Sequence, residues 1–335
     1  MRTSTPSVYI RGLGAYAPER RVTNEEIAQK VDTTDEWIRS RSGIGERRIA
    51  APGENPSDMA VKAAEIAIER SGLRREEIDL VICGTMTADM LIPSTASLIA
   101  AKLGLKEIPA FDLGAACSGF IYMLQVGRAL MLTGDYRNIL IVGAEKLSSY
   151  LNWKDRNTCV LFGDGAGAAV LSATDEPGVG ILGNVLGADG SNPDLLYCPA
   201  GGSARPASAE TVANDEHFIR MNGKEVFKIA TRMMSASCEK VLAKCGVGLD
   251  QVTCVVPHQA NVRIIETVAK QLNISMDIIP INLDRYGNTS AASIPLVLDE
   301  AYRAGRFKHG DYILLVAFGA GLTWGASLIK WHDAR

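Results

Sequence analysis

The sequence contains no apolar run that approaches the ~20 residues of a membrane-spanning helix, and its first residues lack the apolar core of a secretion signal. Charge of one sign is not in excess either, because the formal net charge is only −3. A basic surface for nucleic acid is therefore not expected. These absences predict a cytoplasmic protein whose partners include neither a membrane nor a nucleic acid.

Patterns that bind metals or form disulfides are also missing. The seven cysteines include no C-x-x-C pair, and their odd number and wide scatter argue against a disulfide framework and a structural zinc site. Only four histidines occur, and three of them, His217, His309 and His332, lie in polar stretches that predict exposed side chains. We expect free thiols, a reducing compartment and no bound metal.

What the sequence does contain is an alternation of strand and helix patterns. Short continuous apolar runs, typical of strands buried on both faces, occur at residues 80–83, 139–142, 160–162, 168–171, 253–256 and 313–317. Helical patterns occupy residues 57–71, 121–132, 226–244 and 263–271. This alternation predicts a layered α/β protein.

The two halves of the chain resemble each other. LVICGT, GAACSGF and GDYRNILIVG in the first half are matched in order by VTCVVPH, YGNTSAAS and GDYILLVAFG in the second. A duplicated fold would place Cys117 and Asn288 at equivalent positions, with His258 at the mouth of a matching strand; chance repetition of βαβ units is the alternative. Residues 189–215, rich in Gly, Pro, Ser and Ala, predict a surface excursion. We divide the chain into halves at 1–180 and 181–335.

Cys117 is the best candidate for a nucleophile. It lies in AACSG, and the following FIYMLQVGRAL is apolar nearly all round, as expected of a buried helix. A cysteine at the start of such a helix faces the positive end of the helix dipole, which favours the thiolate. A small buried hydrophobic role, which most free cysteines have, is the alternative.

Two polar residues are candidates to complete a site around this cysteine. His258 follows an apolar strand in VVPHQAN, where its side chain can project into a cleft, and Asn288 lies in the tight turn YGNTSAAS. The Asn-Thr-Ser segment can also be an ordinary helix cap. The surrounding sequences do not match a papain-like hydrolase. A His–Asn donor pair is suited instead to holding a thioester oxygen as it becomes an enolate.

Trp37 and Arg41 suggest a nucleotide-bearing substrate. They are four residues apart in DTTDEWIRSRSG and so share one helix face behind a Thr/Asp cap, where a planar ring could lie between indole and guanidinium. A partly buried tryptophan beside a solvated arginine is the simpler alternative. The glycine loop GDGAG at residues 163–167 lacks the G-K-[ST] of a phosphate-binding loop and predicts a close-packed turn.

Five ordered segments, AACSGF, FGDGAGAAVL, PHQANVRI, YGNTSAASIP and FGAGLTWG, resemble the motifs of the 3-oxoacyl-[acyl-carrier-protein] synthase III family of the thiolase superfamily. The likeness covers nearly the whole chain. It implies a five-layered αβαβα thiolase-like fold of two duplicated halves, usually assembled as a homodimer. It also implies an acyltransferase of fatty acid synthesis that needs no cofactor and acts on acyl-CoA and malonyl-acyl carrier protein.

The resemblance gives each residue of the site a role. Cys117 would take an acyl group from acyl-CoA, with acetyl-CoA or a short branched primer as the expected donor. His258 and Asn288 would hold the malonyl thioester carbonyl while carbon dioxide leaves and the carbanion attacks the acyl-cysteine. The backbone amides of Cys117 and Ala320 would form the oxyanion hole, and Phe318 would help to exclude water.

The resemblance also implies four binding sites. Trp37 and Arg41 would sandwich adenine, with a further contact from Arg156. Residues of the second half would line the pantetheine tunnel: Asn222, Gly223, Phe227, Ala260 and Asn261. The acidic carrier protein would contact the segment after His258 and nearby cations: Gln259, Ala260, Asn261, Val262, Arg263, Lys228 and Lys270. For the two lysines, a plain solvated charge is the alternative. Ile92 would cap the acyl pocket of the partner subunit, where an aliphatic side chain could admit a longer or branched primer.

Related families fit the sequence less well. A degradative thiolase needs a second cysteine near FGAGLTWG, which is absent, and a hydroxymethylglutaryl-CoA synthase needs a glutamate base near Thr85, where the sequence offers only Asp89. A specialised condensing enzyme of a secondary-metabolite pathway shares the Cys-His-Asn set and is the main alternative. A thioesterase or a non-catalytic acyl-binding protein is a weaker one.

Overall fold

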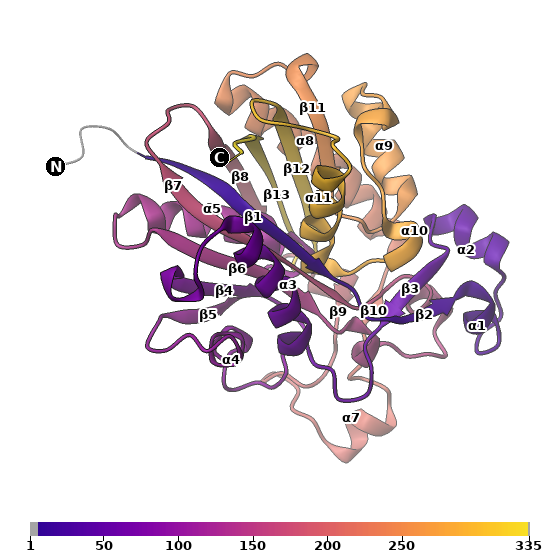
Figure 1. The fold of residues 1–335 in the computed structure, drawn as a ribbon. Helices are drawn as coiled ribbons and strands as arrows, with labels where there is room; N and C mark the ends of the chain where they lie inside the picture. The colour runs from indigo at the N-terminus through magenta and orange to yellow at the C-terminus, as the bar shows by residue number, and fades with distance from the viewer. Residues whose placement is uncertain (1–5, 334–335) are drawn as a thin grey trace.

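The chain folds into five layers, with two β-sheets that enclose a central pair of helices and carry further helices on their outer faces (Figure 1). The computed structural model describes residues 6–333. The first sheet has the order β1-β7-β6-β4-β5 and the second the order β11-β12-β13-β8. The first sheet consists of β1 (Ser7–Tyr16), β4 (Leu80–Gly84), β5 (Ala110–Leu113), β6 (Asn138–Glu145) and β7 (Gly165–Thr174). The second consists of β8 (Gly180–Ala188), β11 (Val252–Pro257), β12 (Tyr312–Gly319) and β13 (Thr323–Lys330).

The second sheet repeats the connectivity of the first, as the sequence repeat predicted. β1 pairs antiparallel with β7, β7 antiparallel with β6, and β6 parallel with β4. β8, β13, β12 and β11 pair in the same order and directions. The five-layered fold of two duplicated halves is therefore confirmed.

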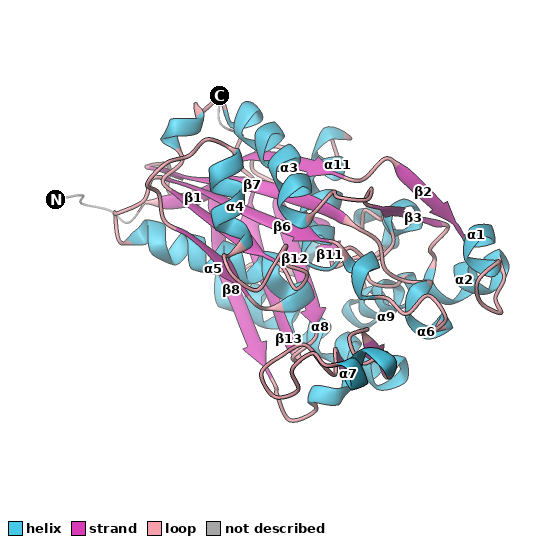
Figure 2. Cartoon of the chain, turned by 90° about the horizontal axis from the view of Figure 1, so that it is seen from below, coloured by secondary structure: helices cyan, strands magenta, loops and turns pink. Residues whose placement is uncertain are grey.

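Helices occupy three of the five layers (Figure 2). The central layer consists of α5 (Gly119–Leu132) and α11 (Ser293–Arg303), which follow the 3₁₀ turns η2 (Ala116–Ser118) and η7 (Ser290–Ala292). The outer layers consist of α3 (Pro56–Ser71) with α4 (Thr95–Lys102), and of α8 (Gly223–Cys245) with α9 (Val262–Leu272). Phe120 and Ile121 of α5 and Ile294 of α11 are buried in one core cluster with side chains of both sheets. Burial of seven of its fourteen residues, with most of the others half-buried, explains why α5 is apolar around most of its circumference.

The repeat also identifies the counterpart of Cys117 in the second half. Ala116 and Ser290, at the start of η2 and η7, both have left-handed backbone, with φ of 47° and 48°. Each is followed by two residues of the turn and then by a central helix. Cys117 therefore corresponds to Ala291, and the expectation that Asn288 is its equivalent is wrong by three residues.

The expected strands and helices agree with the structure except at residues 160–162. The other five apolar runs lie in β4, β6, β7, β11 and β12. Residues 160–162 instead follow the short helix α6 (Arg156–Cys159), and Phe162 forms only an isolated bridge with Asn288. The run is apolar because Leu161 and Phe162 line a cavity, which a strand pattern does not distinguish from a place in a sheet.

Smaller elements project from the two sheets. Near one edge lie β2 (Arg20–Thr23), α1 (Asn24–Ala28), α2 (Asp35–Ser42), β3 (Glu46–Ile49) and α10 (Leu283–Tyr286). The excursion at residues 189–215 is mostly exposed, as expected, and contains β9 (Leu196–Tyr197) and α7 (Ala209–Ala213). β9 pairs with β10 (Arg220–Met221), which brings Leu196 to the wall of a cavity. Across residues 6–333, none of the helices has the length and apolarity to span a bilayer.

The division at residue 180 separates the two sheets in the sequence, since β7 ends at Thr174 and β8 begins at Gly180. The two sheets nevertheless share one interior, in which Ile139 of β6 and Ile313 of β12 belong to the same core cluster. The division into two halves at residue 180 therefore remains a prediction. It marks where one copy of the structural repeat ends and the next begins, and both copies contribute to one core.

Gly143→Ala is expected to destabilise the protein at the contact between the halves. A Cβ atom at this position of β6 would lie 2.3 Å from the carbonyl oxygen of Ala291 in η7, so backbone would have to move. We expect a loss of about 1–3 kcal/mol of unfolding free energy in urea denaturation at fixed protein concentration. Gly202→Ala is the control, because a Cβ there meets no atom within 4 Å and should change stability little. Equal effects of the two substitutions would contradict this account of the contact.

Candidate active site

Cys117 lies in η2, between the end of β5 and the start of the central helix α5. Only 4% of its surface is exposed. Gly319 of β12 approaches it so closely that a Cβ atom at 319 would lie 2.7 Å from the Cys117 amide nitrogen. The cysteine is therefore held where the first half of the chain meets the second sheet.

Burial is the main cause of the low acidity of the Cys117 thiol. Loss of water raises its pKa to about 12, and the carboxyl of Glu145 acts in the same direction. The resting group is therefore a neutral thiol. The sequence predicted that the dipole of the following helix favours the thiolate, and that influence stays a prediction.

His258 comes from the second half and directly follows β11. Its backbone N–H donates to Val316 O at 2.8 Å, and its Nδ1 lies 2.6 Å from Ser293 Oγ at the start of α11. Burial lowers the pKa of His258 to about 3, so the imidazole is neutral. Ser293, which was not singled out from the sequence, engages one ring nitrogen and thereby orients the ring.

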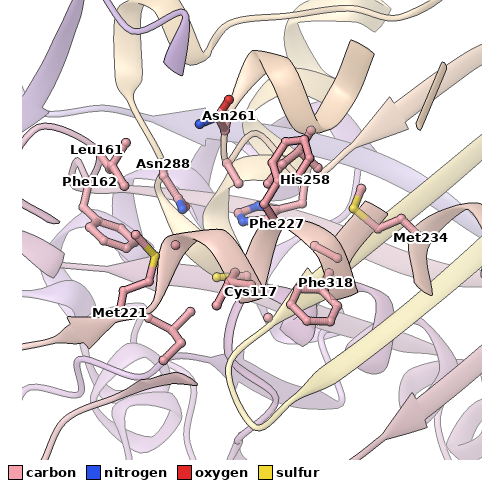
Figure 3. A pocket seen from close by; sticks show the side chains of 17 residues that line it. Cys117, Leu161, Phe162, Met221, Phe227, Met234, His258, Asn261, Asn288 and Phe318 are labelled. Carbon is pink, nitrogen blue, oxygen red and sulfur yellow. The ribbon is translucent and has the colours of Figure 1, made fainter. Parts of the chain in front are cut away.

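Hydrogen bonds of its backbone and of its side-chain oxygen hold Asn288 in place. Its N–H donates to Leu161 O at 2.8 Å, and its carbonyl oxygen accepts from Gly163 N–H at 3.0 Å. The side-chain Oδ1 accepts from the backbone N–H of Ser290 at 2.9 Å. The amide Nδ2 is thus left as the donor that faces the same space as the Cys117 sulfur and the His258 ring (Figure 3).

A single cavity of about 120 Å³ brings the three predicted residues together (Figure 3). Phe318 also lines it, as do four of the residues predicted for the pantetheine tunnel: Gly223, Phe227, Ala260 and Asn261. The fifth, Asn222, is exposed and caps α8 by accepting the N–H of Glu225 at 3.4 Å. The cavity wall between Cys117 and this N-terminal end of α8 is mainly apolar, which suits an extended flexible chain.

The predicted nucleotide site differs in detail from the structure. The Arg156 guanidinium, rather than that of Arg41, lies over the Trp37 ring, 4.8 Å from its centre. Arg156 also donates to Asp32 O at 2.8 Å. Arg41 is exposed, and its carbonyl oxygen accepts the side-chain N–H of Asn261 at 3.0 Å. Trp37 and Arg156 are thus the stacked pair in this structure, and Arg41 is joined to the cavity lining through Asn261.

A second apolar cavity of about 110 Å³ also reaches Cys117 and Ala320. The sequence analysis did not identify its walls, which come from several segments: Thr87, Leu147, Tyr150, Phe162, Leu196 and Ile219. Ile92 is not among them and is 85% exposed, next to Leu91 at 92%. Ile92 therefore does not fill the acyl cavity of its own chain.

Three of the predicted carrier-protein contacts are exposed cations. Arg263 and Lys270 lie on α9 and Lys228 on the neighbouring α8, and across residues 6–333 they make no ion pair with a carboxylate. Val262 is partly exposed beside them. Unpaired cations on adjacent helices suit an acidic partner.

Gln259 was wrongly predicted as a carrier-protein contact. Its side chain is fully buried, where Nε2 donates to Pro257 O at 2.9 Å and Oε1 accepts from Asn282 N–H at 3.1 Å. These bonds tie the segment that carries His258 to the segment before α10. Gln259 therefore positions its neighbours and does not reach the surface.

Glu145, at the end of β6, is a site residue that the sequence analysis missed. It is completely buried, and its carboxylate accepts from Thr87 Oγ1 at 2.6 Å, from Thr85 Oγ1 at 3.3 Å and from Met86 N–H at 3.1 Å. Burial raises the pKa of Glu145 to about 7 despite these donors. The sequence pattern offered only Asp89 as an acid in this region, whereas Asp89 accepts from Ser57 Oγ at 2.6 Å.

Glu145→Gln is expected to lower the pKa of Cys117, because it removes a buried negative charge that opposes the thiolate. The wild-type charge is present above pH 7, where Glu145 is ionised, so the difference should be largest there. Alkylation of Cys117 by iodoacetamide, followed across a pH series by peptide mass spectrometry, should reach its half-maximal rate at lower pH in the variant. Glu239→Gln, on the exposed side of α8, should leave the profile unchanged. An unchanged profile in Glu145→Gln would show that Cys117 does not sense this charge.

The duplicated five-layered fold, with a buried cysteine at the start of a central helix and neutral His and Asn side chains facing it, defines a thiolase-type acyltransferase. Residues 111–190 match the family described as 3-oxoacyl-[acyl-carrier-protein (ACP)] synthase III, and residues 242–331 match its C-terminal part. The chain belongs to the beta-ketoacyl-[acyl-carrier-protein] synthase III family.

Individual relatives cover nearly the whole chain. It is 53% identical to the beta-ketoacyl-[acyl-carrier-protein] synthase III of Caldanaerobacter subterraneus subsp. tengcongensis, over 96% of this chain and 97% of that one. The crystal structure of 3-oxoacyl-[acyl-carrier-protein] synthase III from Aquifex aeolicus VF5 is similar with a TM-score of 0.90 and 46% identity, covering 97% of this chain and 100% of that one. The priming beta-ketosynthase from the R1128 polyketide biosynthetic pathway is also similar, with a TM-score of 0.91 and 34% identity over 100% and 99% of the two chains.

Proposed function

We propose that this enzyme starts fatty acid synthesis by joining an acyl group from acyl-CoA to malonyl-acyl carrier protein. The observation that carries the proposal is the convergence of Cys117, His258 and Asn288 on one mainly apolar cavity. The relatives at about half identity carry the same family name over nearly their full length. The reaction balances without a cofactor, since the two thioesters supply every heavy atom that moves and solvent supplies one proton.

In the first step, the Cys117 sulfur attacks the thioester carbon of acyl-CoA. The new bond joins Sγ to the acyl carbon, the bond to the CoA sulfur breaks, and the thiol proton leaves with CoA as its free thiol. The backbone amides of Cys117 and Ala320 are the proposed donors to the oxygen that becomes negative. Support comes from the apolar cavity that both residues line, in which the acyl chain would lie.

In the second step, His258 and Asn288 donate to the carbonyl oxygen of the malonyl thioester. Carbon dioxide leaves, the negative charge moves onto that oxygen as an enolate, and its carbon attacks the acyl-cysteine. Cys117 departs as the thiolate and takes up one proton from solvent. A neutral imidazole suits this role when Ser293 O–H donates to Nδ1, because the ring proton then lies on Nε2. Phe318, 4% exposed in the same cavity, would keep water from the carbanion.

Substrates would enter along the cavity that ends at α8. Adenine would stack against Trp37, with either Arg41, as the resemblance implies, or Arg156 on its other face; the second arrangement requires the present 4.8 Å pair to separate. Asn222, Gly223, Phe227, Ala260 and Asn261 are the proposed pantetheine contacts. The carrier protein would bind the cations of α8 and α9 together with Val262.

We propose that the loop containing Ile92 packs against a second copy of the chain. This loop exposes Met90, Leu91 and Ile92, beside which Phe111 is also exposed, and such a set of apolar side chains favours burial in an interface. We retain Ile92 as the residue that would reach the acyl cavity of the partner subunit. The seven free thiols support a cytoplasmic location.

A condensing enzyme of a secondary-metabolite pathway is the second candidate. The 34% identity to the polyketide priming synthase favours it, because that protein shares the fold over the full chain. Incubation with a series of acyl-CoAs followed by malonyl-carrier protein distinguishes the two. Acetyl or short branched primers converted to 3-oxoacyl-carrier protein support fatty acid initiation, whereas reaction with unusual primers only supports the second candidate. Release of free acid without a carbon–carbon bond would indicate a thioesterase.

Substitutions should separate the two chemical steps. Cys117→Ala is expected to abolish the acyl-enzyme mass in intact-protein mass spectrometry. His258→Ala and Asn288→Ala should still acylate but should release carbon dioxide from malonyl-carrier protein about 10²–10³-fold more slowly, because each loses one donor to the enolate oxygen. Neither substitution introduces a charge. Normal release of carbon dioxide by either variant would overturn the role of that residue.

Charge reversal should weaken carrier-protein binding alone. Arg263→Glu and Lys270→Glu are each expected to raise KM for malonyl-carrier protein several-fold at low salt, and to leave the acylation rate from acyl-CoA unchanged. Lys106→Glu, an exposed lysine between α4 and β5, is the control and should change neither. An equal effect of all three substitutions would show that net charge, and not this surface, determines the affinity.

A further inference from the structure

Two histidines and a glutamate meet at the end of the molecule where β13 finishes, outside both cavities that reach Cys117. Glu176 lies in the connection between β7 and β8, His309 in the connection between α11 and β12, and His332 directly after β13. One ligand atom from each lies within 4.8 Å of the others. These three residues, which we call the terminal cluster, are brought together only by the fold, so no sequence spacing could reveal them.

Within the terminal cluster, the side chains of His332 and Glu176 lie close together but are not hydrogen-bonded to each other. His332 Nδ1 is buried and has no hydrogen-bond partner among the described residues, although it lies 3.5 Å from Glu176 Oε2. Two ligands of a tetrahedral zinc ion lie about 3.4 Å apart when each is about 2.1 Å from the metal. A buried ring nitrogen at this distance from a carboxylate oxygen therefore fits a shared metal ion better than a direct bond.

The rings of the cluster are held in place by their surroundings. His332 was expected to be exposed, but its side chain is only 12% exposed and its ring meets Tyr9 edge-on at 4.5 Å. The Asp333 carboxylate accepts from the Trp331 ring N–H at 2.7 Å and from the backbone N–H of His309 at 3.2 Å. Such contacts fix the segments that carry both histidines before any ligand arrives, which lowers the cost of binding.

Binding would disturb little of the present structure. His309 Nδ1 accepts a long hydrogen bond from Asp333 N–H at 3.3 Å, and this bond is lost whichever ring nitrogen of His309 binds a metal. Glu176 and His309 are exposed, so their side chains can close the remaining distance and a metal can enter from solvent. Solvent can supply the fourth ligand. Imidazole and carboxylate together favour zinc among the common divalent ions.

We propose that Glu176, His309 and His332 bind one divalent transition-metal ion of the zinc type, with water as the fourth ligand. The ion would join the connection between the two halves to the end of β13, and so stabilise the chain without taking part in the reaction. No metal was expected from the sequence, because the three ligands are far apart in the chain and no cysteine pattern accompanies them.

The test uses the full-length chain with no affinity tag, after treatment with a chelator. Cys198→Ser is the background, because Cys198 is the exposed cysteine that could bind zinc by itself. Titration calorimetry with Zn²⁺ should show one ion per chain, and Co²⁺ should give the visible bands of a tetrahedral complex without a thiolate charge-transfer band. Zn²⁺ should also raise the melting temperature.

His309→Ala is the decisive variant, because His309 is exposed and its loss should not impair folding. It should weaken Zn²⁺ binding at least about tenfold and remove the thermal shift, and Glu176→Gln should do the same. His217→Ala, a partly buried histidine elsewhere, should bind as the background does. Condensation activity should be equal in all of these proteins. Absence of stoichiometric binding, or binding that survives His309→Ala, would overturn the proposal, and neither result would bear on the role of Cys117.

Discussion

The removal of water from Cys117, His258 and Asn288 is the constraint on which the rest of this structure depends. The thiol and the imidazole are less than 5% exposed, and burial moves their pKa values in opposite directions, to about 12 and about 3. Both groups are consequently neutral. The three groups come from both halves of the chain, so the site forms only where the halves meet.

Neutrality determines what chemistry the site supports. A neutral His258 and the Asn288 amide can donate to an oxygen that gains charge, and in a dry cavity such donors stabilise an enolate far more than they would in water. They do not depend on an ionised base, which burial would disfavour. The carboxyl of Glu145 is the exception, with its pKa raised to about 7 next to the nucleophile. Its charge therefore adds to the effect of burial in raising the pKa of Cys117.

Local patterns predicted β4, β6, β7, β11 and β12, the helices α3, α5, α8 and α9, and the candidate trio, because each of these depends on a short run of residues. The second central helix, α11, was not among the predicted elements. Errors arose where the environment is created by distant segments. Residues 160–162 are apolar because they line a cavity; Gln259 is polar because it satisfies buried backbone groups; and Glu145 reaches the site from the end of a different strand. The contact of Arg156 with the Trp37 ring and the terminal cluster were also not predicted, because both depend on contacts that only the folded chain makes.

The protonation state of His258 in the resting enzyme tests the central claim most directly. Histidine labelled with ¹⁵N, with the signal of His258 assigned by comparison with His258→Ala, reports the charge of the ring as pH is varied. We predict a neutral imidazole, protonated on Nε2, at every pH from neutral down to the point where the protein unfolds. Titration of His258 near its ordinary pKa of 6.5 would contradict the account, since it would show that the site is not dry enough to hold neutral donors.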